Sequence, residues 1–296
     1  MPGKTAILIV SYNATENLKA CLESLRWTEG REEYKVFLGD NSSSNVISAM
    51  VTNEYPWVAF SMNEVNLGFA KGMNRLCAQA VTEYAPDYIL LVNPDMRIDS
   101  QSIELMKKSL DNGEKIAAVG PKLLDDENNI EDSVITPPKF HLLFMKFMIH
   151  GLTGSERISL NYDPTSWSRA QAISGACMLI RRVAIDDAGF FNERFFMYFE
   201  DVEFCWRLRK KGWEIYYDPN AIAHHSRGKS SEEKEDVRRW RAEQTYISLI
   251  TYFSATGQKM DLWLTRLMIL GILRARILLN KDADWSRTVI DKIKSM

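Results

Sequence analysis

Strands and helices alternate regularly over the first 122 residues. Short apolar runs rich in β-branched residues, such as TAILIVSY at 5–12, are followed by helical spacing of apolar residues, as in TENLKACLESLRW at 15–27. The pattern predicts further strands at 34–40, 57–62, 87–92 and 116–124, and further helices at 68–81 and 102–112. Such alternation predicts an α/β fold with a mostly parallel, doubly wound sheet.

The regular pattern stops near residue 124. Residues 124–168 form an irregular insertion, and a strand is expected again at 170–182. A helical stretch follows from about 233 to 280. We therefore expect a catalytic domain at 1–230 and a helical C-terminal extension at 231–296.

Charge is distributed unevenly along the chain, although its formal net value is only −2. Residues 1–226 carry 23 Lys and Arg against 30 Asp and Glu, whereas residues 227–296 carry 14 against 9. A basic, apolar-rich C-terminal region fits an anionic membrane surface, but it also fits docking on the acidic body or a homodimer contact. The stretch LWLTRLMILGILRARILL at 262–279 does not look like a membrane-spanning helix, because arginines interrupt it. Core packing on the catalytic domain explains its apolar residues about as well as a membrane surface does. No nucleic-acid partner is expected.

The four cysteines stand far apart, without the close pairing typical of metal sites. No signal-peptide pattern opens the sequence. Reduced thiols in the cytoplasm are therefore the expected state.

Polar residues follow several predicted strands directly. They are Ser11 to Asn13, Asp40 to Ser42, Asn66, and Asn93 to Asp95. Each alone is explained equally well by a helix N-cap or an Asx-turn. Ligands of doubly wound sheets bind outside the carboxyl ends of the strands, so four such clusters together predict one binding site.

An acidic pair, Glu200 and Asp201, follows the aromatic segment FFMYF at 195–199. Acidic residues are common in a first helical turn, so a purely structural role is the simpler alternative. The aromatic neighbours, however, favour a partly dry pocket in which a carboxylate acts as a general base.

Two adjacent histidines, His224 and His225, end the last predicted strand. They point to opposite faces if the segment is extended, so only one of them can reach the site. A satisfied loop histidine is the simpler alternative. With Asp95 and a diphosphate, one histidine would form a site suited to Mg²⁺ or Mn²⁺.

An ordered set of motifs resembles an inverting family 2 glycosyltransferase of the GT-A fold, and most closely its rhamnosyltransferase-like subgroup. The resemblance covers residues 5 to about 230. It rests on ILIVSYN, DNSS, NLGFAKGMN, LLVNPD, SGACMLIRR, FFMYFEDVEFCWRLRKKGW and a final histidine before GKS. It implies a mixed α/β sheet and transfer of a sugar from a nucleotide diphosphate.

The resemblance assigns roles to matching positions. The donor nucleotide would be bound by Ser11, Asn13, Asp40, Asn66, Gly68, Lys71, Asn93 and Asp95. Among these, Asp40 would accept a hydrogen bond from the pyrimidine ring N–H, and Gly68 would allow the nucleoside or phosphates to approach the backbone closely. Asp95 and His225 would ligate the divalent cation, His225 matching the family position better than His224. Asp201 would deprotonate the acceptor hydroxyl with support from Glu200, and Arg207 would brace that helix.

The implied reaction is a single displacement with inversion. dTDP-rhamnose is the favoured donor. A UDP-sugar is the alternative, because Asp40 would accept a hydrogen bond from a ring N–H that thymine and uracil share. The acceptor would be a cell-surface glycan or a lipid-linked sugar, with the enzyme in the cytoplasm or on the inner face of the membrane.

Two alternative functions remain. A sugar-nucleotide pyrophosphorylase would need a glycine- and basic-rich motif near its N-terminus, which VSYNATENLKA lacks. A nucleotide- or carbohydrate-binding module that has lost activity is the other alternative, and the presence of Asp95, Asp201 and His225 together argues against it.

Overall fold

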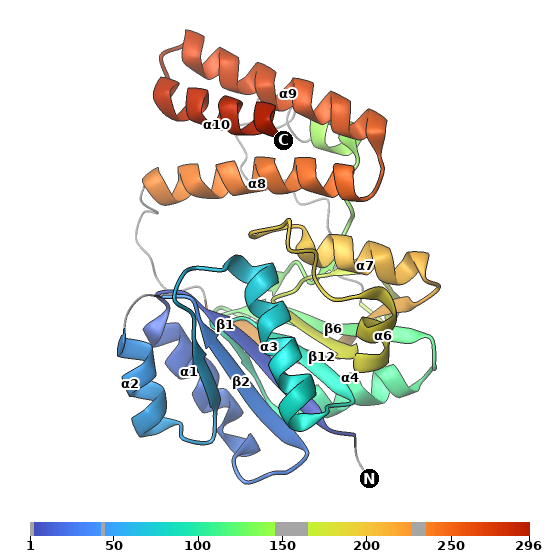
Figure 1. The fold of residues 1–296 in the computed structure, drawn as a ribbon. Coiled ribbons are helices and arrows are strands. Elements are labelled where there is room, and N and C mark those ends of the chain that lie inside the picture. Colours follow the sequence, from blue (N-terminus) through green and yellow to red (C-terminus); the bar gives the residue numbers. More distant parts are fainter. Residues whose placement is uncertain (1–2, 43–44, 146–164, 227–234) are drawn as a thin grey trace.

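A computed structural model describes residues 3–42, 45–145, 165–226 and 235–296. It shows an α/β body beneath a layer of C-terminal helices (Figure 1). The body's sheet has strands β1 (Thr5–Ser11), β2 (Tyr34–Asp40), β3 (Ala59–Met62), β4 (Tyr88–Val92), β5 (Met96–Ile98), β6 (Ile116–Asp125), β7 (Ile130–Glu131), β9 (Ser168–Arg169), β11 (Cys177–Arg181) and β12 (Glu214–His225). A separate small pair joins β8 (Val134–Ile135) to β10 (Ala172–Ile173).

The main sheet is mixed, with the order β3-β2-β1-β4-β11-β6-β12-β5. The strands β3, β2, β1 and β4 pair in parallel, as do β6 and β12. Strand β11 runs antiparallel to both β4 and β6, and β5 runs antiparallel to β12. The predicted α/β class with a mixed sheet is confirmed. The single strand predicted at 170–182 is instead divided, because a turn at 174–176 separates β10, which pairs with β8, from β11, which pairs with β4 and β6.

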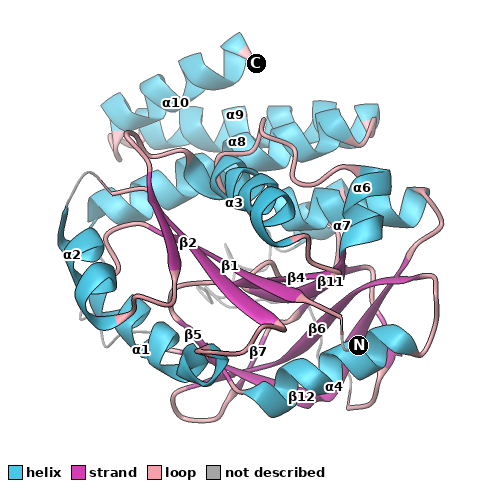
Figure 2. Cartoon of the chain, turned by 60° about the horizontal axis from the view of Figure 1, so that its bottom comes forward, coloured by secondary structure: helices cyan, strands magenta, loops and turns pink. Residues whose placement is uncertain are grey.

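Helices cover both faces of the sheet (Figure 2). The helices of the body are α1 (Thr15–Leu25), the 3₁₀ turn η1 (Arg26–Thr28), α2 (Asn45–Glu54), α3 (Gly68–Tyr84), α4 (Ser100–Asp111), α6 (Arg182–Ala188) and α7 (Glu200–Lys210). Alternate residues of β1 serve the two cores: Leu8 packs with α3 and α7, whereas Ile7 packs with α1, α2 and α4. This two-sided burial explains why the strand reads as a continuous apolar run.

The C-terminal region contains α8 (Glu235–Ala255), α9 (Lys259–Leu278) and α10 (Ala283–Ser295). Helix α8 lies between the body and the other two helices (Figure 1). Its Tyr252 and Phe253 belong to the same core as α3 and α7. Ile269 of α9 and Val289 of α10 belong to a separate small core. Helix α10 lies beyond the predicted helical stretch, which ended near residue 280.

Two properties of the chain bear on its environment. All four cysteines are free and buried. Within the described ranges, the structure contains no helix with the length and hydropathy needed to cross a bilayer.

Candidate active site

The carboxyl edge of the parallel strands brings the first predicted residues together. Ser11 ends β1 and pairs in register with Asp40 at the end of β2. Both are fully buried, and the backbone N–H of Asn41 donates to the Ser11 carbonyl at 2.8 Å. Ser11 Oγ has no hydrogen-bond partner within the described part of the chain. A buried hydroxyl without a partner at this edge is suited to a polar ligand atom.

Asp40 is held by the residues that follow it. Its Oδ1 accepts a hydrogen bond from the Ser42 backbone N–H at 3.1 Å, and its Oδ2 accepts one from Ser42 Oγ at 2.5 Å. This Asx-turn, one of the two alternatives considered from the sequence, is therefore present. It fixes the carboxylate direction, and each oxygen retains a lone pair for a further donor.

A chain of amide hydrogen bonds supports the same edge. Asn63 Nδ2 donates to Asn41 Oδ1 at 2.8 Å, and Arg75 Nη1 donates to Asn63 Oδ1 at 2.6 Å. Asn41 Nδ2 in turn donates to the Gly68 carbonyl at 3.1 Å. The sequence analysis missed Asn63 and Arg75, because nothing in their local patterns indicates that β3 and α3 meet here.

Gly68 begins α3 with a positive φ of 73°. A Cβ atom at Gly68 would lie 2.4 Å from the carbonyl oxygen of Phe196, which accepts a hydrogen bond from the Phe69 N–H at 2.8 Å. The aromatic segment before α7, not open space for a ligand, therefore requires glycine at this position. The expected reason for Gly68, close approach of the donor, is replaced by this packing. Nearby, Asn66 Oδ1 accepts from the Gly68 N–H at 2.9 Å.

Three predicted nucleotide-binding side chains lie on the surface. Asn13, Asn66 and Lys71 are exposed. Asn13 adopts a left-handed backbone conformation, with φ of 52°. The structure thus places them at the rim and not among the buried groups.

A histidine bridges two carboxylates at the end of β12. His225 Nε2 lies 3.1 Å from Asp95 Oδ2, and His225 Nδ1 lies 2.5 Å from Glu131 Oε2. The hydrogen bond to Asp95 is the main cause that raises the pKa of His225 to about 9, with Glu131 contributing in the same direction. The ring is therefore held in the field of two negative charges.

These residues fit a divalent cation. A histidine ligand commonly donates its second ring nitrogen to a carboxylate, which orients the ring, and Glu131 occupies that position for His225. Oδ1 of Asp95 and Oδ1 of Asn93 are buried without a hydrogen-bond partner in the described ranges. No cluster of three or more Asp, Glu, His or Cys side chains suited to a metal occurs among the described residues. Asp95 and His225 would therefore supply only part of the ligand set that a divalent cation needs.

Glu131 was not singled out from the sequence. It lies in the polar stretch DDENNIED, and it reaches His225 only because β7 folds back on β6, with Glu131 opposite Leu123. The turn signal at Asp125, whose side chain accepts from the backbone N–H of Glu127 and Asn129, was the available indication.

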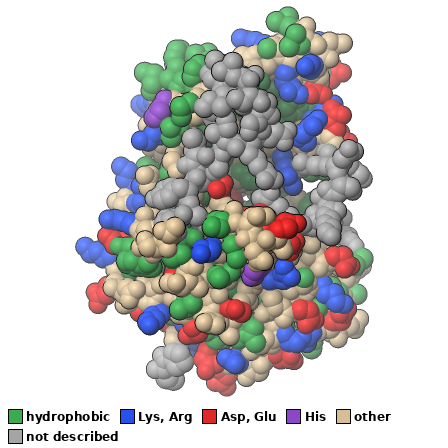
Figure 3. Space-filling model, turned by 180° about the vertical axis from the view of Figure 1, so that it is seen from behind, with side chains coloured by type: hydrophobic (Ala, Val, Ile, Leu, Met, Phe, Trp, Pro, Cys, Tyr) green, Lys and Arg blue, Asp and Glu red, His purple; other side chains and the backbone are tan. Residues whose placement is uncertain are grey.

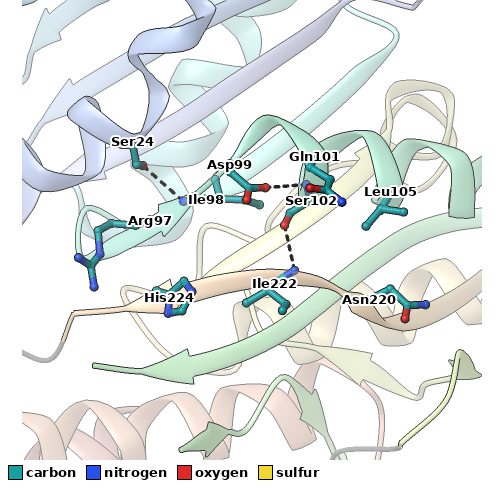
Figure 4. Close-up of a pocket in the computed structure, with 10 residues that line it drawn as sticks. All are labelled: Ser24, Arg97, Ile98, Asp99, Gln101, Ser102, Leu105, Asn220, Ile222 and His224. Atoms are coloured by element: carbon teal, nitrogen blue, oxygen red, sulfur yellow. Dashed lines mark hydrogen bonds between the residues drawn. The ribbon is translucent and has the colours of Figure 1, made fainter. Parts of the chain in front are cut away.

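The neighbouring His224 points elsewhere. It lines an open groove of about 550 Å³ together with Arg97 and Asn220, beside the first turn of α4 (Figure 4). As expected for an extended segment, the two histidines face opposite sides of β12. Only His225 contacts Asp95.

The acidic pair begins α7. Asp201 Oδ2 accepts a hydrogen bond from the Gly175 backbone N–H at 2.8 Å, and Oδ1 accepts one from the Val202 N–H at 2.7 Å. Glu200 is 6% exposed, and its Oε2 has no hydrogen-bond partner in the described structure. Backbone N–H groups therefore orient the Asp201 carboxyl, whereas few hydrogen bonds offset the loss of hydration of the buried Glu200 carboxyl.

Burial raises the pKa of both carboxyls. For Asp201 the two backbone donors oppose that rise. For Glu200 the pKa lies well above its usual range, because burial is reinforced by the negative charge of Asp201. Two adjacent carboxyls of this kind do not ionise independently, and Asp201, with its hydrogen bonds, is the one that loses its proton first.

The segment preceding α7 is strained, and it is held by hydrogen bonds from α3 and α8. Tyr198 and Phe199 adopt positive φ values of 72° and 65°. Ser248 of α8 donates to the Met197 carbonyl at 2.7 Å, so the C-terminal region holds this segment in place. Left-handed conformations at bulky residues persist only where the surroundings enforce them, and they cluster at functional sites.

Arg207 braces α7 as expected. Its Nε donates to Glu203 at 2.9 and 3.0 Å, and its Nη1 donates to the Gly189 carbonyl at 3.0 Å. The guanidinium is thus committed to its own helix and to the loop after α6.

One turn connects the two halves of the site. In the turn at 174–176, the Gly175 N–H donates to Asp201, and the Ala176 carbonyl accepts from the Asn93 N–H at 2.8 Å. A Cβ at Gly175 would lie only 3.3 Å from the Asp201 Cβ. The acidic helix start and the loop that carries Asp95 are therefore held in a fixed relation.

Comparison with known sequences identifies the family. The family model described as "Glycosyltransferase like family 2" matches residues 2–243. The chain belongs to this family. It is 27% identical over 281 residues to the N-acetylglucosaminyl-diphospho-decaprenol L-rhamnosyltransferase of Mycobacterium tuberculosis, covering 88% of each chain. It is 26% identical to the Escherichia coli rhamnosyltransferase WbbL over 227 residues, covering 74% of this chain and 83% of that one.

Solved structures of low sequence identity share the fold of this glycosyltransferase. The mannosyltransferase PcManGT from Pyrobaculum calidifontis, solved with GDP-Man and Mn²⁺, matches with a TM-score of 0.55 and 12% identity. The match covers 87% of this chain and 65% of the other. GalNAc-T7, solved with UDP, GalNAc and Mn²⁺, gives the same TM-score and identity over 84% of this chain and 52% of its own.

Proposed function

We propose that this glycosyltransferase moves an L-rhamnosyl unit from dTDP-rhamnose to a hydroxyl of a lipid-linked or cell-surface glycan acceptor, with inversion at the anomeric carbon. The observation that carries this proposal is the turn at 174–176, which ties Asp201 to the loop bearing Asp95. A base and a diphosphate site held at a fixed relation are what a single displacement requires.

The donor side is formed by the sheet edge. The Asp40 carboxylate, which Ser42 holds in place, accepts a hydrogen bond from the pyrimidine ring N–H. Ser11 Oγ provides a further polar contact. Asn13, Asn66 and Lys71 border the nucleotide from the rim. The rhamnosyltransferase names of two relatives support rhamnose as the sugar.

Asp95 and His225 would hold a divalent cation, Mg²⁺ or Mn²⁺, with Glu131 orienting the imidazole. When bound, such a cation offsets the negative charge that develops on a diphosphate leaving group. Two structural neighbours carry Mn²⁺ with a nucleotide or nucleotide sugar, which supports this choice.

On the acceptor side, Asp201 removes the proton of the attacking hydroxyl. Its carboxylate is aimed by the Gly175 and Val202 N–H groups, and the raised pKa that burial gives it makes it a stronger base than a solvated aspartate. Burial and the charge of Asp201 raise the pKa of Glu200, and Glu200 supports the start of the helix beside the base.

The experiment that tests the proposal is a transfer assay with a synthetic N-acetylglucosaminyl diphosphate lipid as acceptor. dTDP-rhamnose, a UDP-hexose and GDP-mannose are supplied separately with Mn²⁺, and the product's anomeric configuration is determined by NMR. We expect transfer from dTDP-rhamnose with inversion. Transfer only from another donor would refute the choice of sugar, and retention of configuration would refute the single displacement.

A further inference from the structure

Helix α9 has an apolar face that no other described element covers. Exposed residues recur along it at intervals of three or four positions. They are Met260, Trp263, Leu267, Gly271, Arg274 and Leu278. We call this set the α9 outer face. On the opposite side of the helix, Thr265, Ile269 and Leu273 are buried against the other C-terminal helices.

The exposure of this face is large. Met260 is 68% exposed, Trp263 58%, Leu267 50% and Leu278 86%. A helix that is apolar on both sides is normally buried on both, so a partner of similar polarity is expected on the outer side. A row of four large apolar side chains differs from the scattered exposed residues that ordinary surfaces carry.

Charge around the α9 outer face is basic. Arg274 is its only charged member, and Lys259 and Lys281 are exposed at the two ends of the helix. Residues 259–296 carry eight Lys and Arg against four Asp. Viewed from behind, hydrophobic side chains gather at the end of the molecule that these helices form, with basic side chains nearby (Figure 3).

The start of the insertion contacts the first turn of α9. The Phe140 backbone N–H donates to Asp261 Oδ1 at 2.8 Å, which holds the helical residues 140–145 against the first turn of α9. Phe144 and Met145, which follow, are 46% and 45% exposed.

We propose that the α9 outer face docks this protein on the surface of an anionic lipid bilayer. Apolar side chains on one helix face with basic groups among and beside them are the features of helices that lie in the membrane interface. Basic groups near an anionic leaflet strengthen such binding. A second copy of the chain fits less well, because a two-fold contact through this face brings basic groups together with no acidic group on the face to pair with them.

The inference deepens the proposed function, since an enzyme with a lipid-linked acceptor works at a bilayer. Vesicle binding, however, needs neither donor nor acceptor. A failure of docking and a failure of rhamnosyl transfer are therefore distinguishable, because each is measured without the other.

The test is co-sedimentation of the full chain with vesicles of phosphatidylcholine alone or with phosphatidylglycerol. We expect binding to the anionic vesicles and weak binding to the neutral ones. Leu267→Ser should lower the partition coefficient roughly 10-fold, as expected for one well-buried aliphatic side chain. Arg274→Glu should lower it by a similar factor, on the order of 10-fold, on anionic vesicles only.

Val183→Ser is the matched control, because Val183 on α6 is 54% exposed and Leu267 is 50% exposed. It should bind as the wild type does. Each variant is checked for unchanged thermal unfolding. Failure of the wild type to sediment with anionic vesicles would overturn the proposal, as would equal binding by Leu267→Ser and Val183→Ser. A dimer in analytical ultracentrifugation that Leu267→Ser dissociates would assign the face to a second copy instead.

Discussion

The two acidic centres of the site hold their carboxyl groups in opposite ways. Asp95 and Glu131 flank His225, whose pKa rises to about 9 because it lies between them. Glu200 and Asp201 have no cationic partner in the described structure, and burial raises the pKa of both. The first centre is suited to positive charge and the second to a proton, and the turn at 174–176 holds them together.

The difference teaches that neighbouring acidic groups are set apart by their surroundings. Carboxylates in a charged, hydrogen-bonded cluster stay ionised and attract cations, whereas carboxyls in a dry environment become better bases. The sequence alone does not distinguish these roles among the acidic residues of the site. Their partners do.

Asp201→Asn is the change with the largest expected effect on the second centre. Without a base for the acceptor hydroxyl, turnover should fall by about 10²–10⁴-fold. Binding of dTDP should stay within about threefold of the wild type, because the nucleotide is assigned to the other centre. Transfer assays and calorimetry check the two quantities separately, and turnover near the wild-type value would remove Asp201 from the role of base.

Glu131→Gln is the corresponding change in the first centre. The loss of the charge that orients His225 should weaken Mn²⁺ affinity in the presence of dTDP by about 10–100-fold. Asp126→Asn is the control, because Asp126 lies in the same stretch but pairs with Arg97 on the surface. Manganese titrations followed by electron paramagnetic resonance measure the affinity. Equal affinities of the two variants would show that Glu131 does not support the metal ligand.

The fall of kcat/KM at low pH reports the protonation of Asp201 in the second centre. Asp201 acts as a base only when ionised, and burial raises its pKa. We therefore expect kcat/KM to fall as the pH drops through a value above about 4, the ordinary range of aspartate. An acid limb at or below the ordinary range, measured with saturating Mn²⁺, would contradict the dry environment assigned to Asp201.

Glu200→Gln should have the smallest effect, because burial and the charge of Asp201 raise the pKa of Glu200 and so favour its neutral form, which glutamine resembles. Turnover should stay within about 10-fold of the wild type. The folded-state pKa of Glu200 is raised, so the native state binds more protons than the unfolded state between the two pKa values. The free energy of unfolding of the wild type should therefore decrease as pH rises through that window, and Glu200→Gln should lack this component. Denaturant titrations across pH measure it, and identical pH dependences would refute the assignment.

Much of the fold followed from local pattern. Apolar runs followed by helical spacing identified β1, β2, β4 and β6, and the rule for strand ends placed Ser11, Asp40 and Asp95 on one edge. These features depend on short stretches of chain, so their signals lie within a few residues of each other.

Other features depend on contacts between distant segments and carry no local signal. Glu131 meets His225 across 94 residues, and Phe196 occupies the space at Gly68 that a ligand was expected to approach. The division between β10 and β11 was not predicted, because SGA reads equally well as a strand interior or as a turn. The bounds of α10 were not predicted, although it lies within the helical extension expected at 231–296, because its apolar residues pack with α9 and this contact leaves no local signal.

The most direct test of the account is calorimetric titration of dTDP into wild type, Asp95→Ala and Asp126→Ala, each with Mn²⁺ and with EDTA. We expect wild type and Asp126→Ala to bind dTDP in the presence of Mn²⁺ and to lose that binding in EDTA. Asp95→Ala should bind poorly in both conditions. Nucleotide binding that is indifferent to both the metal and Asp95, or no binding at all, would contradict the assignment of this edge as a metal-assisted donor site.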